Sequence, residues 1–464
     1  MTGYASKYLR DARRATADLR QRQTLRNALQ QHEVARDQRQ AAFRDWQTAR
    51  QAAAETKWEA INSLPQHLAA FADKLAVRGT KVHWASTDKQ ACDIIVGIVQ
   101  ARGARAIVKS KTMTAEEIHL NEALEHVGYE VVETDLGEFI AQLRHERPSH
   151  FVFPSLHLTR AEIKDLFQHA LGEAPSDDPQ ELAGVARHAL RKKYLAADVG
   201  LTGANFAIAE TGMISITENE GNARLTAALP KTMITLVGIE KILPRMADLA
   251  LFLPMLATAG AGQLMTAYNT LYGGPRQFGE CDGPEEFHVV LLDNHRSRLL
   301  ADVQQRDALH CIRCGACLNV CPVFRNVGGH AYNTTYAGPI GSVITPHLRG
   351  LEDWKHLSAA SSLCGACTDA CPVKIDLHHH LLHNRRNAVK KKPSGREQFA
   401  YDLFTSFVNH PAVWSFGKKI GRLLQPFHKL IRGGPLDPLR AWTKTRDLPP
   451  LAGQSFKDWW RKRR

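Results

Sequence analysis

The pattern of apolar and polar positions changes several times along the chain. Residues 5–60 are rich in Ala, Gln, Arg and Glu and contain no Pro or Gly. This composition favours helix, and we expect one long helix or a helical hairpin there. From Lys81 onwards, short β-branched runs alternate with stretches of helical periodicity. The first segment is therefore predicted to be a helical region, and an α/β domain is predicted to follow it.

The alternating segment predicts a mainly parallel sheet with helices between its strands. The first expected strands are Lys81–Ala85, Arg105–Lys109, Glu130–Glu133 and His150–Phe153. Helices are expected between and after them, over residues 88–102, 114–127, 136–145 and 159–171. From Ala197 the chain turns to strands and Gly-rich turns. Further strands are expected at Phe206–Ala209, Met213–Thr217, Met233–Val237, Thr266–Thr270 and Phe287–Leu292.

The remainder of the chain has a helical pattern, with helices expected over residues 337–357 and 373–392. The tail contains several Pro and Trp residues and predicts a helical extension. We therefore divide the chain into a helical region (1–65), an α/β domain (66–297), an all-helical domain (298–392) and a basic C-terminal extension (393–464).

Seven of the nine cysteines form two runs in the all-helical domain. They are Cys311, Cys314, Cys317 and Cys321 in the first run, and Cys364, Cys367 and Cys371 in the second. The spacing of two, two and three residues, closed by Pro, is the one with which bacterial ferredoxins hold cubane iron–sulfur clusters. The second run repeats it with Ser361 in place of the first cysteine. We therefore expect two iron–sulfur clusters in a ferredoxin-type domain, and hence electron transfer.

In paired motifs of this kind, the cysteine before Pro completes the cluster of the other motif. Crossing the runs assigns the first cluster to Cys311, Cys314, Cys317 and Cys371. It assigns the second to Cys321, Cys364 and Cys367, with Ser361 as a candidate for the fourth ligand. Because a serine oxygen is a harder and poorer iron ligand than a thiolate, three outcomes stay open for the second cluster. They are a [4Fe-4S] cluster with an oxygen ligand, which we favour, a [3Fe-4S] cluster, and a cluster with one labile iron.

Zinc is the main alternative, because Cys-x-x-Cys pairs also bind zinc. Zinc sites rarely use a four-cysteine run closed by Pro, so the pattern favours iron. Tight clustering also fits metal binding in a reducing cytosol better than a disulfide framework. Cys92 and Cys281 stand apart and are expected to be ordinary thiols, although Cys281 stays open as an additional ligand. A solvated helix face is expected for His378, His379, His380 and His383.

The chain is 44% hydrophobic and 23% charged, as is usual for globular proteins. It has no apolar run near the roughly 20 residues of a membrane helix and no N-terminal signal segment, so we expect a cytoplasmic protein. The net charge of +13 gathers at residues 8–45, Arg385–Arg396 and Arg461–Arg464. These blocks are either solvated or dock to an acidic partner or the anionic inner face of a membrane. Without an RNA- or DNA-reading motif, no nucleic-acid partner is expected.

A second group of polar motifs lies in the α/β segment. Asp198–Asn205, Glu210–Gly212 and Thr217–Arg224 combine small residues with Asp, Asn, Glu and Thr at expected strand ends. This combination is typical of a ligand crevice in an open α/β sheet. Lys109–Thr112 follows a strand and opens a helix, as an anion-binding turn does. The same residue types also serve as turn and cap residues, so both interpretations stay open.

These motifs together resemble a known family. The segments similar to the lactate-utilisation (LUD) domain are Lys109–Met113, Asp198–Asn205, Ala209–Gly212, Asn219–Asn222, Tyr272–Arg276 and Leu292–Asn294. A LUD domain followed by the two cysteine runs resembles the lactate utilisation protein B family. The tail, with Arg432–Pro435 and Ala441–Thr443, resembles the C-terminal extension of that family, so the likeness covers residues 70–462. His295 stands where Gly is expected, which affects one local turn.

The resemblance implies an electron carrier in the oxidation of L-lactate to pyruvate. It implies two companion subunits, a cysteine-rich iron–sulfur protein and a smaller LUD protein. In the leading hypothesis below, the clusters pass electrons on towards quinone at the inner membrane face. The resemblance also implies an open, mainly parallel sheet similar to that of sugar-phosphate isomerases and CoA transferases, and that Ser361 is a family trait. No catalytic residue is carried over, because that likeness concerns the fold alone.

Three hypotheses follow from these observations. The leading one is an iron–sulfur electron-transfer subunit of a bacterial L-lactate oxidation system that allows growth on L-lactate. The alternative is that the LUD domain itself binds and oxidises the 2-hydroxy acid, although no flavin or nicotinamide fingerprint is present. The third, a basic regulatory protein that senses redox state through its clusters, rests on net charge alone.

Overall fold

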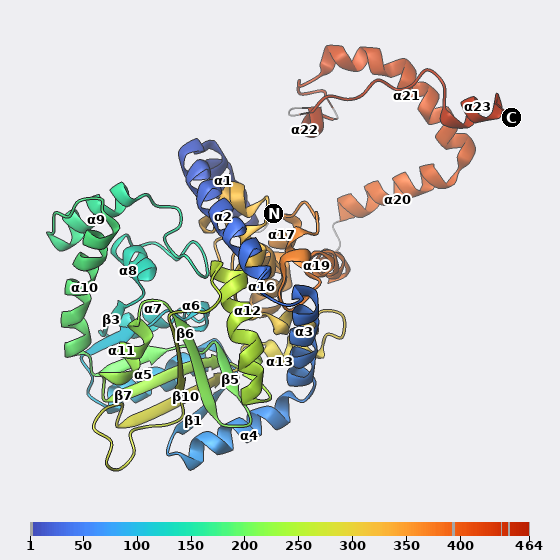
Figure 1. Cartoon of the computed structure of the whole chain (residues 1–464). Coiled ribbons are helices and arrows are strands. Elements are labelled where there is room, and N and C mark those ends of the chain that lie inside the picture. The colour runs from blue at the N-terminus through green and yellow to red at the C-terminus, as the bar shows by residue number, and fades with distance from the viewer. Residues whose placement is uncertain (1–2, 392–394, 438, 444–445, 464) are drawn as a thin grey trace. The chain divides into compact units, whose positions relative to one another are not determined.

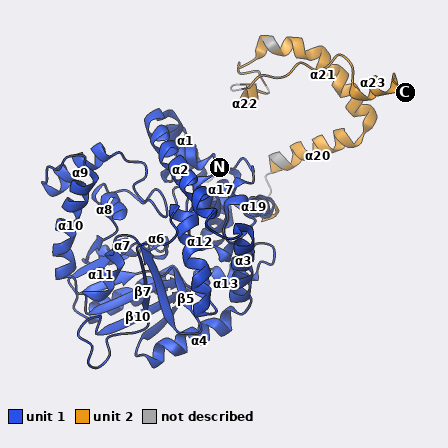
Figure 2. Ribbon diagram, viewed as in Figure 1, with its two compact units in different colours: residues 1–388 blue, residues 389–464 orange. Residues whose placement is uncertain are grey.

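The computed structural model describes residues 3–391, 395–437, 439–443 and 446–463. The chain forms two compact units, residues 1–388 and residues 389–464 (Figure 2). In the predicted basic blocks, residues 392–394, Arg464 and the side chain of Arg396 lie outside the described residues. Within the described part, no helix combines the length and the apolar character needed to cross a bilayer.

A six-stranded parallel sheet forms the centre of the first unit (Figure 1). In spatial order the strands are β1 (Lys81–Ala85), β10 (Glu286–Leu292), β7 (Thr232–Gly238), β4 (Val199–Thr202), β2 (Ala106–Lys109) and β3 (Glu130–Glu133). The predicted mainly parallel sheet is confirmed. The central strand β4 is not among the predicted strands, because its residues Val-Gly-Leu-Thr belong to a Gly-containing polar motif that lacks the usual pattern of a strand.

Helices and a second sheet cover the two faces of this sheet. Successive side chains of a strand point to opposite faces. In β7, Ile234 and Leu236 pack with the helices α5 and α7, while Met233 and Val237 pack with α4 and the second sheet. The strand is therefore an unbroken apolar run buried on both sides. The covering helices of this part are α4 (Leu64–Val77), α5 (Asp88–Ala101), α6 (Met113–Glu117), α7 (Leu120–His126) and α11 (Asn222–Ala228).

The second sheet has four strands in the order β8-β5-β6-β9. Its strands are β8 (Ile242–Leu243), β5 (Phe206–Ile208), β6 (Met213–Glu218) and β9 (Tyr268–Tyr272). The tight β5–β6 turn ends at Gly212, whose φ is +67° and which packs against α4 so closely that a Cβ would lie 2.5 Å from Lys74 Cβ. Glycine is needed there for both reasons. The sheet is followed by the apolar helix α12 (Leu249–Ala261).

Beyond β3, the helices α8 (Leu136–Leu143), α9 (Arg160–Leu171) and α10 (Pro179–Ala196) pack on Val108 and Val132 at one edge of the central sheet. The strand predicted at His150–Phe153 is wrong, because these residues form a loop between α8 and α9. Their apolar side chains are buried in other ways. The ring of Phe151 packs edge-on against Tyr336, and His150 stacks with Phe153.

The N-terminal region forms three helices, α1 (Gly3–Ala17), α2 (Leu19–Gln40) and α3 (Trp46–Asn62), in place of the predicted single helix or hairpin. The breaks fall at aspartates. Asp18 accepts a hydrogen bond from Gln21 N at 2.9 Å, and Asp45 accepts one from Gln47 N at 2.8 Å. These contacts are N-caps, which satisfy the free amides at the start of a new helix.

The cysteine-rich region is all-helical, as predicted. Its elements are α13 (Arg296–Ala301), η3 (Arg306–His310), α14 (Ala316–Asn319), α15 (Phe324–Val327), η4 (His330–Tyr332), α16 (Gly338–Arg349), α17 (Leu351–Ala359), α18 (Ala366–Ala370) and α19 (Leu377–Lys391). One apolar core joins it to α1, α2, α3 and α12. The domain boundaries expected near residues 65 and 297 therefore fall inside one compact unit, whereas the unit boundary at 388 lies near the expected one at 392.

The second unit is helical and is described by itself. Its helices are α20 (Gly395–Asn409), α21 (Pro411–Ile431), α22 (Arg440–Thr443) and α23 (Phe456–Arg461). In α21 the apolar residues recur every three or four positions, and they are exposed: Val413, Phe416, Ile420, Leu423, Leu424 and Phe427. Lys418, Lys419 and Arg422 occupy other positions on the helix. The helix is thus amphipathic and basic.

Candidate metal centres and the adjoining cavity

The two cysteine runs fold into loops with the same backbone pattern. In the first, Arg313 and Gly315 have φ values of +61° and +79°; in the second, Leu363 and Gly365 have φ values of +55° and +84°. Each glycine is followed at once by a short helix, α14 or α18, that carries the third position of its motif. Left-handed residues at matching positions mean that the loops turn in the same way. The internal repeat is therefore structural as well as sequential.

Four cysteines line one small cavity, and they are Cys311, Cys314, Cys317 and Cys371, here called the four-cysteine group. Three of them are buried, and Cys311 is half-buried. Burial, followed by the neighbouring Cys371 and Cys311 thiols, raises the pKa of Cys314 above its usual range. Burial likewise raises the pKa of Cys371 to about 12. The structure thus brings together the four residues that crossed ligation assigns to the first cluster.

The other three cysteines, Cys321, Cys364 and Cys367, form the three-cysteine group. Burial, with Cys321 and Cys364 nearby, raises the pKa of Cys367 to about 11. This group lies nearer the surface, because Cys364 is exposed and Cys321 is half-buried. The two groups are neighbours, since Cys367 is among the thiols that raise the pKa of Cys317.

Ser361 occupies the same place in the second loop as Cys311 in the first. The backbone N–H of Leu363 donates to Ser361 Oγ at 3.1 Å, and that of Arg313 donates to Cys311 Sγ at 3.4 Å. Arg385 fixes the serine segment by donating to the carbonyls of Ser358 at 2.8 Å and Ser361 at 3.3 Å. The hydroxyl is therefore oriented as the equivalent thiol is.

The residues present fit iron–sulfur clusters. Backbone amides point at the sulfur atoms, with Phe324 N donating to Cys321 Sγ at 3.5 Å and Ile375 N to Cys371 Sγ at 3.4 Å. Such donors stabilise the negative charge of a thiolate-ligated cluster and tune its reduction potential. The raised thiol pKa values also mean that iron must displace protons when it binds.

Cations from distant segments surround the four-cysteine group. Arg50 of α3 donates from Nε to Cys371 O at 2.9 Å and from Nη2 to Thr368 O at 3.1 Å. Lys57, also on α3 and fully buried, donates to Glu240 O at 2.7 Å and Ile242 O at 3.2 Å. Burial lowers the pKa of Lys57 to about 7. The N-terminal helix α3 thus holds the second cysteine loop through Arg50 and places a second basic side chain, Lys57, near the four-cysteine group.

A buried ionic network joins the α/β core to the first cysteine loop. Arg296 pairs with Glu117 at 2.7 Å and with Glu240, and Arg313 pairs with Glu240 at 3.2 Å. Tyr336 donates to Glu117 at 2.6 Å and lies under the Arg313 guanidinium, 4.7 Å from its ring centre. Although burial opposes ionisation, the arginines hold the pKa of Glu240 at about 2. Arg313, one of the two residues between Cys311 and Cys314, is therefore held firmly against the α/β part.

A cavity of about 320 Å³ lies at the carboxyl ends of β2, β3, β4 and β7, where open α/β sheets bind ligands. Parts of three of the predicted polar segments meet there: Ser110–Thr112, Gly203–Asn205 and Thr217–Glu220. Its wall also includes Lys241, Arg313 and Cys314. The cavity therefore reaches the loop of the four-cysteine group.

Other parts of the predicted polar motifs serve the fold. Lys109 is buried in ion pairs with Glu133 at 2.8 Å and Glu116 at 3.0 Å. Asp198 accepts from the backbone of Arg105 at 2.7 Å, and Glu210 accepts from Met246 N at 2.7 Å. These residues are therefore engaged in the fold, Lys109 through buried ion pairs and the two acids through hydrogen bonds from backbone amides. The ligand-site interpretation applies only to the segments around the cavity.

Comparison with known proteins agrees with this arrangement. Family models match in order: the LUD domain at residues 68–292, a 4Fe-4S dicluster domain at 307–375, and the C-terminal region of lactate utilisation protein B at 376–464. Lactate utilization protein B of Shouchella clausii is 45% identical over 95% of this chain and 94% of its own length. That of Bacillus subtilis is 45% identical over 89% and 88%. The chain belongs to the lactate utilization protein B family.

The lactate utilization protein B family assignment rests on sequence. A solved structure of a DUF162 family protein from Deinococcus radiodurans covers 50% of this chain and 98% of its own at 17% identity, with a TM-score of 0.28, which is too low to bear on the fold. The family likeness and the crossed cysteine arrangement were both predicted from the motifs. Lys241, Arg50 and Lys57 were not, because nothing in the local sequence marks them.

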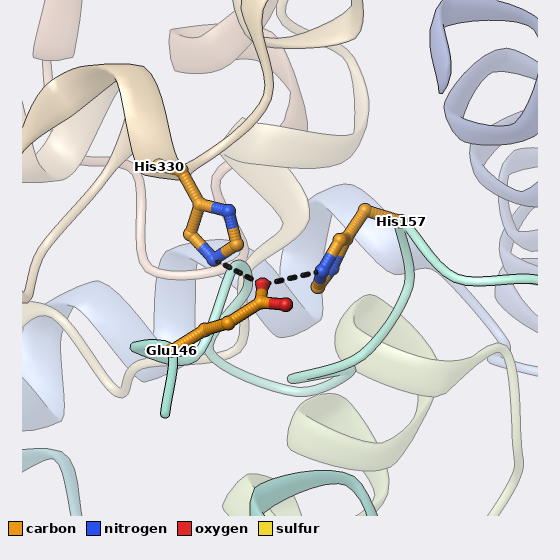
Figure 3. Close-up of side chains that lie close together, drawn as sticks. All are labelled: Glu146, His157 and His330. Carbon is orange, nitrogen blue, oxygen red and sulfur yellow. Dashed lines mark hydrogen bonds and ion pairs between the residues drawn. The ribbon is translucent and has the colours of Figure 1, made fainter. Parts of the chain in front are cut away.

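A second polar cluster in this lactate utilization protein B family member lies in a different cavity. Glu146, His157 and His330 approach one another (Figure 3), with His157 Nε2 at 2.9 Å and His330 Nε2 at 3.8 Å from Glu146 Oε2. Arg144 already pairs with the carboxylate, and His330 Nε2 donates to Arg147 O at 2.7 Å. The cluster is thus better explained as a tie between the α8–α9 loop and η4 than as a metal site.

The remaining cysteines and histidines lie outside the two groups. Cys92 is half-buried on α5, and Cys281 is exposed in the β9–β10 loop. Cys92 donates to Ile118 O at 3.5 Å, as an ordinary thiol does. The histidine run of α19 is only partly solvated. His379 is exposed, whereas His380 is buried beside Asp307.

Proposed function

We propose that this chain is the iron–sulfur electron-transfer subunit of an L-lactate oxidation system. The observation that carries the proposal is the shared wall: Arg313 and Cys314 belong both to the LUD cavity and to the loop of the four-cysteine group. An iron–sulfur cluster supplies one-electron transfer, so two clusters match the two electrons released when a 2-hydroxy acid becomes a 2-oxo acid. Electrons would enter at the buried four-cysteine group and leave from the more exposed three-cysteine group.

The proposed ligands follow from the two groups. Cys311, Cys314, Cys317 and Cys371 hold a [4Fe-4S] cluster in this proposal. Cys321, Cys364 and Cys367 hold a second one, with the Ser361 hydroxyl as its fourth ligand. The equivalent hydrogen bonds to Ser361 Oγ and Cys311 Sγ support this role for the serine. Electron paramagnetic resonance of anaerobically isolated protein tests it, since a strong three-iron signal in fresh, active protein would contradict a four-iron second cluster.

The companions proposed are a cysteine-rich iron–sulfur subunit and a smaller LUD-domain subunit. The exposed Cys364 supports an exit to a partner, because electron transfer between proteins needs a cluster close to the surface. The catalytic step is then shared between subunits. Co-purification of the three proteins from lactate-grown cells checks the assembly, and recovery of this chain alone under conditions that preserve lactate oxidation would contradict it.

We propose that α21 attaches the assembly to an anionic membrane surface near the quinone pool. The exposed apolar positions of α21 and its basic residues Lys418, Lys419 and Arg422 support this, because amphipathic basic helices lie in the headgroup region. Sedimentation with vesicles tests it. Binding to vesicles that contain anionic lipid, lost on Phe427→Asp, supports the proposal, and equal recovery with neutral and anionic vesicles contradicts it.

A second candidate function is favoured by the same shared wall. If the LUD domain itself oxidises the 2-hydroxy acid, the cavity is an active site and the chain is the dehydrogenase. The two functions differ in one assay, anaerobic addition of L-lactate to the isolated chain with its clusters. Bleaching of the clusters by L-lactate alone favours the dehydrogenase. Bleaching only after the companion subunits are added supports the carrier.

A further inference from the structure

The cavity beside Cys314 has two electrically different ends. At one end, Asp135 and Glu218 are among the groups that act on Glu220, and Lys111 pairs with Asp135 at 3.3 Å. At the other end, Lys241 lies close to Arg313 and to the four-cysteine group. The cavity therefore has more acidic than basic groups away from the cysteines and is basic next to them.

Lys241 is the exceptional cation of this end. Only 8% of it is exposed, yet it makes no hydrogen bond or ion pair with any residue that the structure describes. The contrast with Lys57 is informative, because that buried lysine donates to two carbonyl oxygens. Burying an ammonium group without a partner is costly. Glu240 and Cys311 attract Lys241 without a direct hydrogen bond or ion pair, so an anion in the cavity would be the direct partner that the ammonium group lacks.

Arg313 contributes a second cation with unused donors. Its Nη2 pairs with Glu240 at 3.2 Å, while its Nε and Nη1 are buried without a hydrogen-bond partner among the described residues. The ring of Tyr336 and the carboxylate of Glu240 fix the guanidinium in place. Together the two side chains offer a fixed planar group and an ammonium group on one wall. Such a pair suits a carboxylate, which accepts charge-assisted hydrogen bonds from both.

We propose that Lys241 and Arg313 bind the carboxylate of a small organic acid, whose remaining polar groups extend towards Asn205 and Thr217 in the same cavity. This site adds a ligand to the proposed function. It rests on that function only for the choice of a 2-hydroxy or 2-oxo acid as the ligand. Bound there, the acid lies against the loop that carries Cys314. Lys241 is a binding residue in this proposal, and Lys111 at the other end is not required.

A simpler role for Lys241 is to neutralise the negative charge of a cluster held by the four-cysteine group. In that case Lys241 affects the reduction potential and no organic acid binds at this wall. Binding of a redox-inert acid separates the two roles. Oxamate, an isostere of pyruvate, serves as the probe, and lactamide, the uncharged amide of lactate, tests whether the negative charge is recognised.

The experiment is anaerobic equilibrium dialysis of the full-length, cluster-containing chain against radiolabelled oxamate at constant ionic strength. Lys241→Met removes the proposed ligand, and Lys241→Arg preserves its charge. Lys231→Met is the matched control, because Lys231 immediately precedes the other end of β7 and its side chain is 80% exposed. Iron and acid-labile sulfide are measured in each variant to establish that both clusters are retained.

We expect saturable binding of one oxamate per chain, competition by L-lactate and no competition by lactamide. Lys241→Met should weaken binding by about tenfold to a hundredfold, as expected for the loss of a hydrogen bond to a charged group. Lys241→Arg should retain most of the affinity, and Lys231→Met all of it. Absence of saturable binding, or competition by lactamide as strong as that by L-lactate, overturns the proposal. Equal affinity of Lys241→Met and the wild type overturns it too.

If Lys241→Met loses its clusters, two other results still test the site. They are the competition of L-lactate and lactamide in the wild type and the affinity of Lys241→Arg for oxamate. The outcome is also independent of electron transfer. Oxamate binding without any lactate-dependent cluster reduction would uphold the site and contradict the proposed function. Lactate-dependent reduction of the clusters through the companion subunits, without oxamate binding, would uphold the proposed function and contradict the site.

Discussion

The two cysteine groups have the same loop geometry but opposite surroundings. The four-cysteine group lies inside the core shared by the N-terminal helices and the cysteine-rich region, with Arg50, Lys57 and Arg313 around it. The three-cysteine group lies nearer the surface, and its loop carries Ser361 where the other carries Cys311. A duplicated motif has thus acquired two environments, one next to a ligand-sized cavity and one next to solvent.

Under the proposed function, this difference assigns each group its place in the electron path. Basic side chains around the buried group, among them Arg50 and Arg313, stabilise added negative charge and favour acceptance of an electron. Under the same proposal, exposure of the other group shortens the distance to a partner protein. The proposed path then runs from the LUD cavity towards the surface.

The largest effect is expected when a buried cysteine of the four-cysteine group is removed. Cys317→Ala should abolish the first cluster, lower bound iron by about half if both clusters are cubanes, and eliminate lactate-dependent electron flow. Iron analysis and lactate-driven dye reduction by the assembled subunits measure the two effects. Cys92→Ala, which changes a thiol outside both groups, is the control and should leave iron unchanged. Full electron flow in Cys317→Ala would contradict the proposed entry point.

Removal of the network that ties the first loop to the α/β part should be nearly as damaging. Arg296→Met leaves Glu117 and Glu240 buried with fewer counter-charges, and breaking a buried ion pair of this kind costs about 3–5 kcal/mol. We expect a lower midpoint of thermal unfolding. Arg245→Met, which breaks exposed ion pairs with Glu59 and Asp248, is matched to it and should change the midpoint little. Equal effects of the two variants would show that burial of the network is unimportant.

A smaller effect is expected when the contact between Arg50 of α3 and the second cysteine loop is removed. Arg50→Met deletes the hydrogen bonds to the carbonyls of Cys371 and Thr368. Because hydrogen bonds to charged groups contribute about 1.5–3 kcal/mol, the rate at which a chelator removes iron should rise about tenfold or more. Lys374→Met removes an exposed hydrogen bond from the same loop to Gln51 and serves as the control. An unchanged rate in Arg50→Met would contradict a stabilising role for this contact.

The smallest effect is expected from a substitution that gives both groups four cysteines. Ser361→Cys should give the second cluster four thiolates and reduce the three-iron signal that appears after brief exposure to air, while Ser361→Ala should increase it. Electron paramagnetic resonance follows both variants, with iron content as the check that each cluster is present. Identical signals in the wild type and both variants would exclude Ser361 as a ligand.

The sequence predicted the parts whose information is local. The strands at 81–85 and 130–133 have the expected bounds, because β-branched runs between turns define them. The spacing, together with the usual crossing of paired motifs, also predicts which four cysteines gather around one cavity. The segments that failed depend on distant partners. His150–Phe153 has strand propensity but is buried against the cysteine-rich region, and β4 contains Gly200 and Thr202 yet lies at the centre of a sheet. Lys241 has no local sequence marker, since its role depends on a loop 72 residues further along the chain.

The central claim, that electrons from lactate pass through these clusters, is tested most directly by one measurement. L-lactate is added anaerobically to this chain together with its companion subunits, and the reduced clusters are followed by electron paramagnetic resonance in the wild type and in Cys317→Ala. The account predicts reduced-cluster signals in the wild type and none from this chain in Cys317→Ala. Oxidation of lactate at an undiminished rate by the Cys317→Ala assembly, with the clusters of this chain still oxidised, would contradict it.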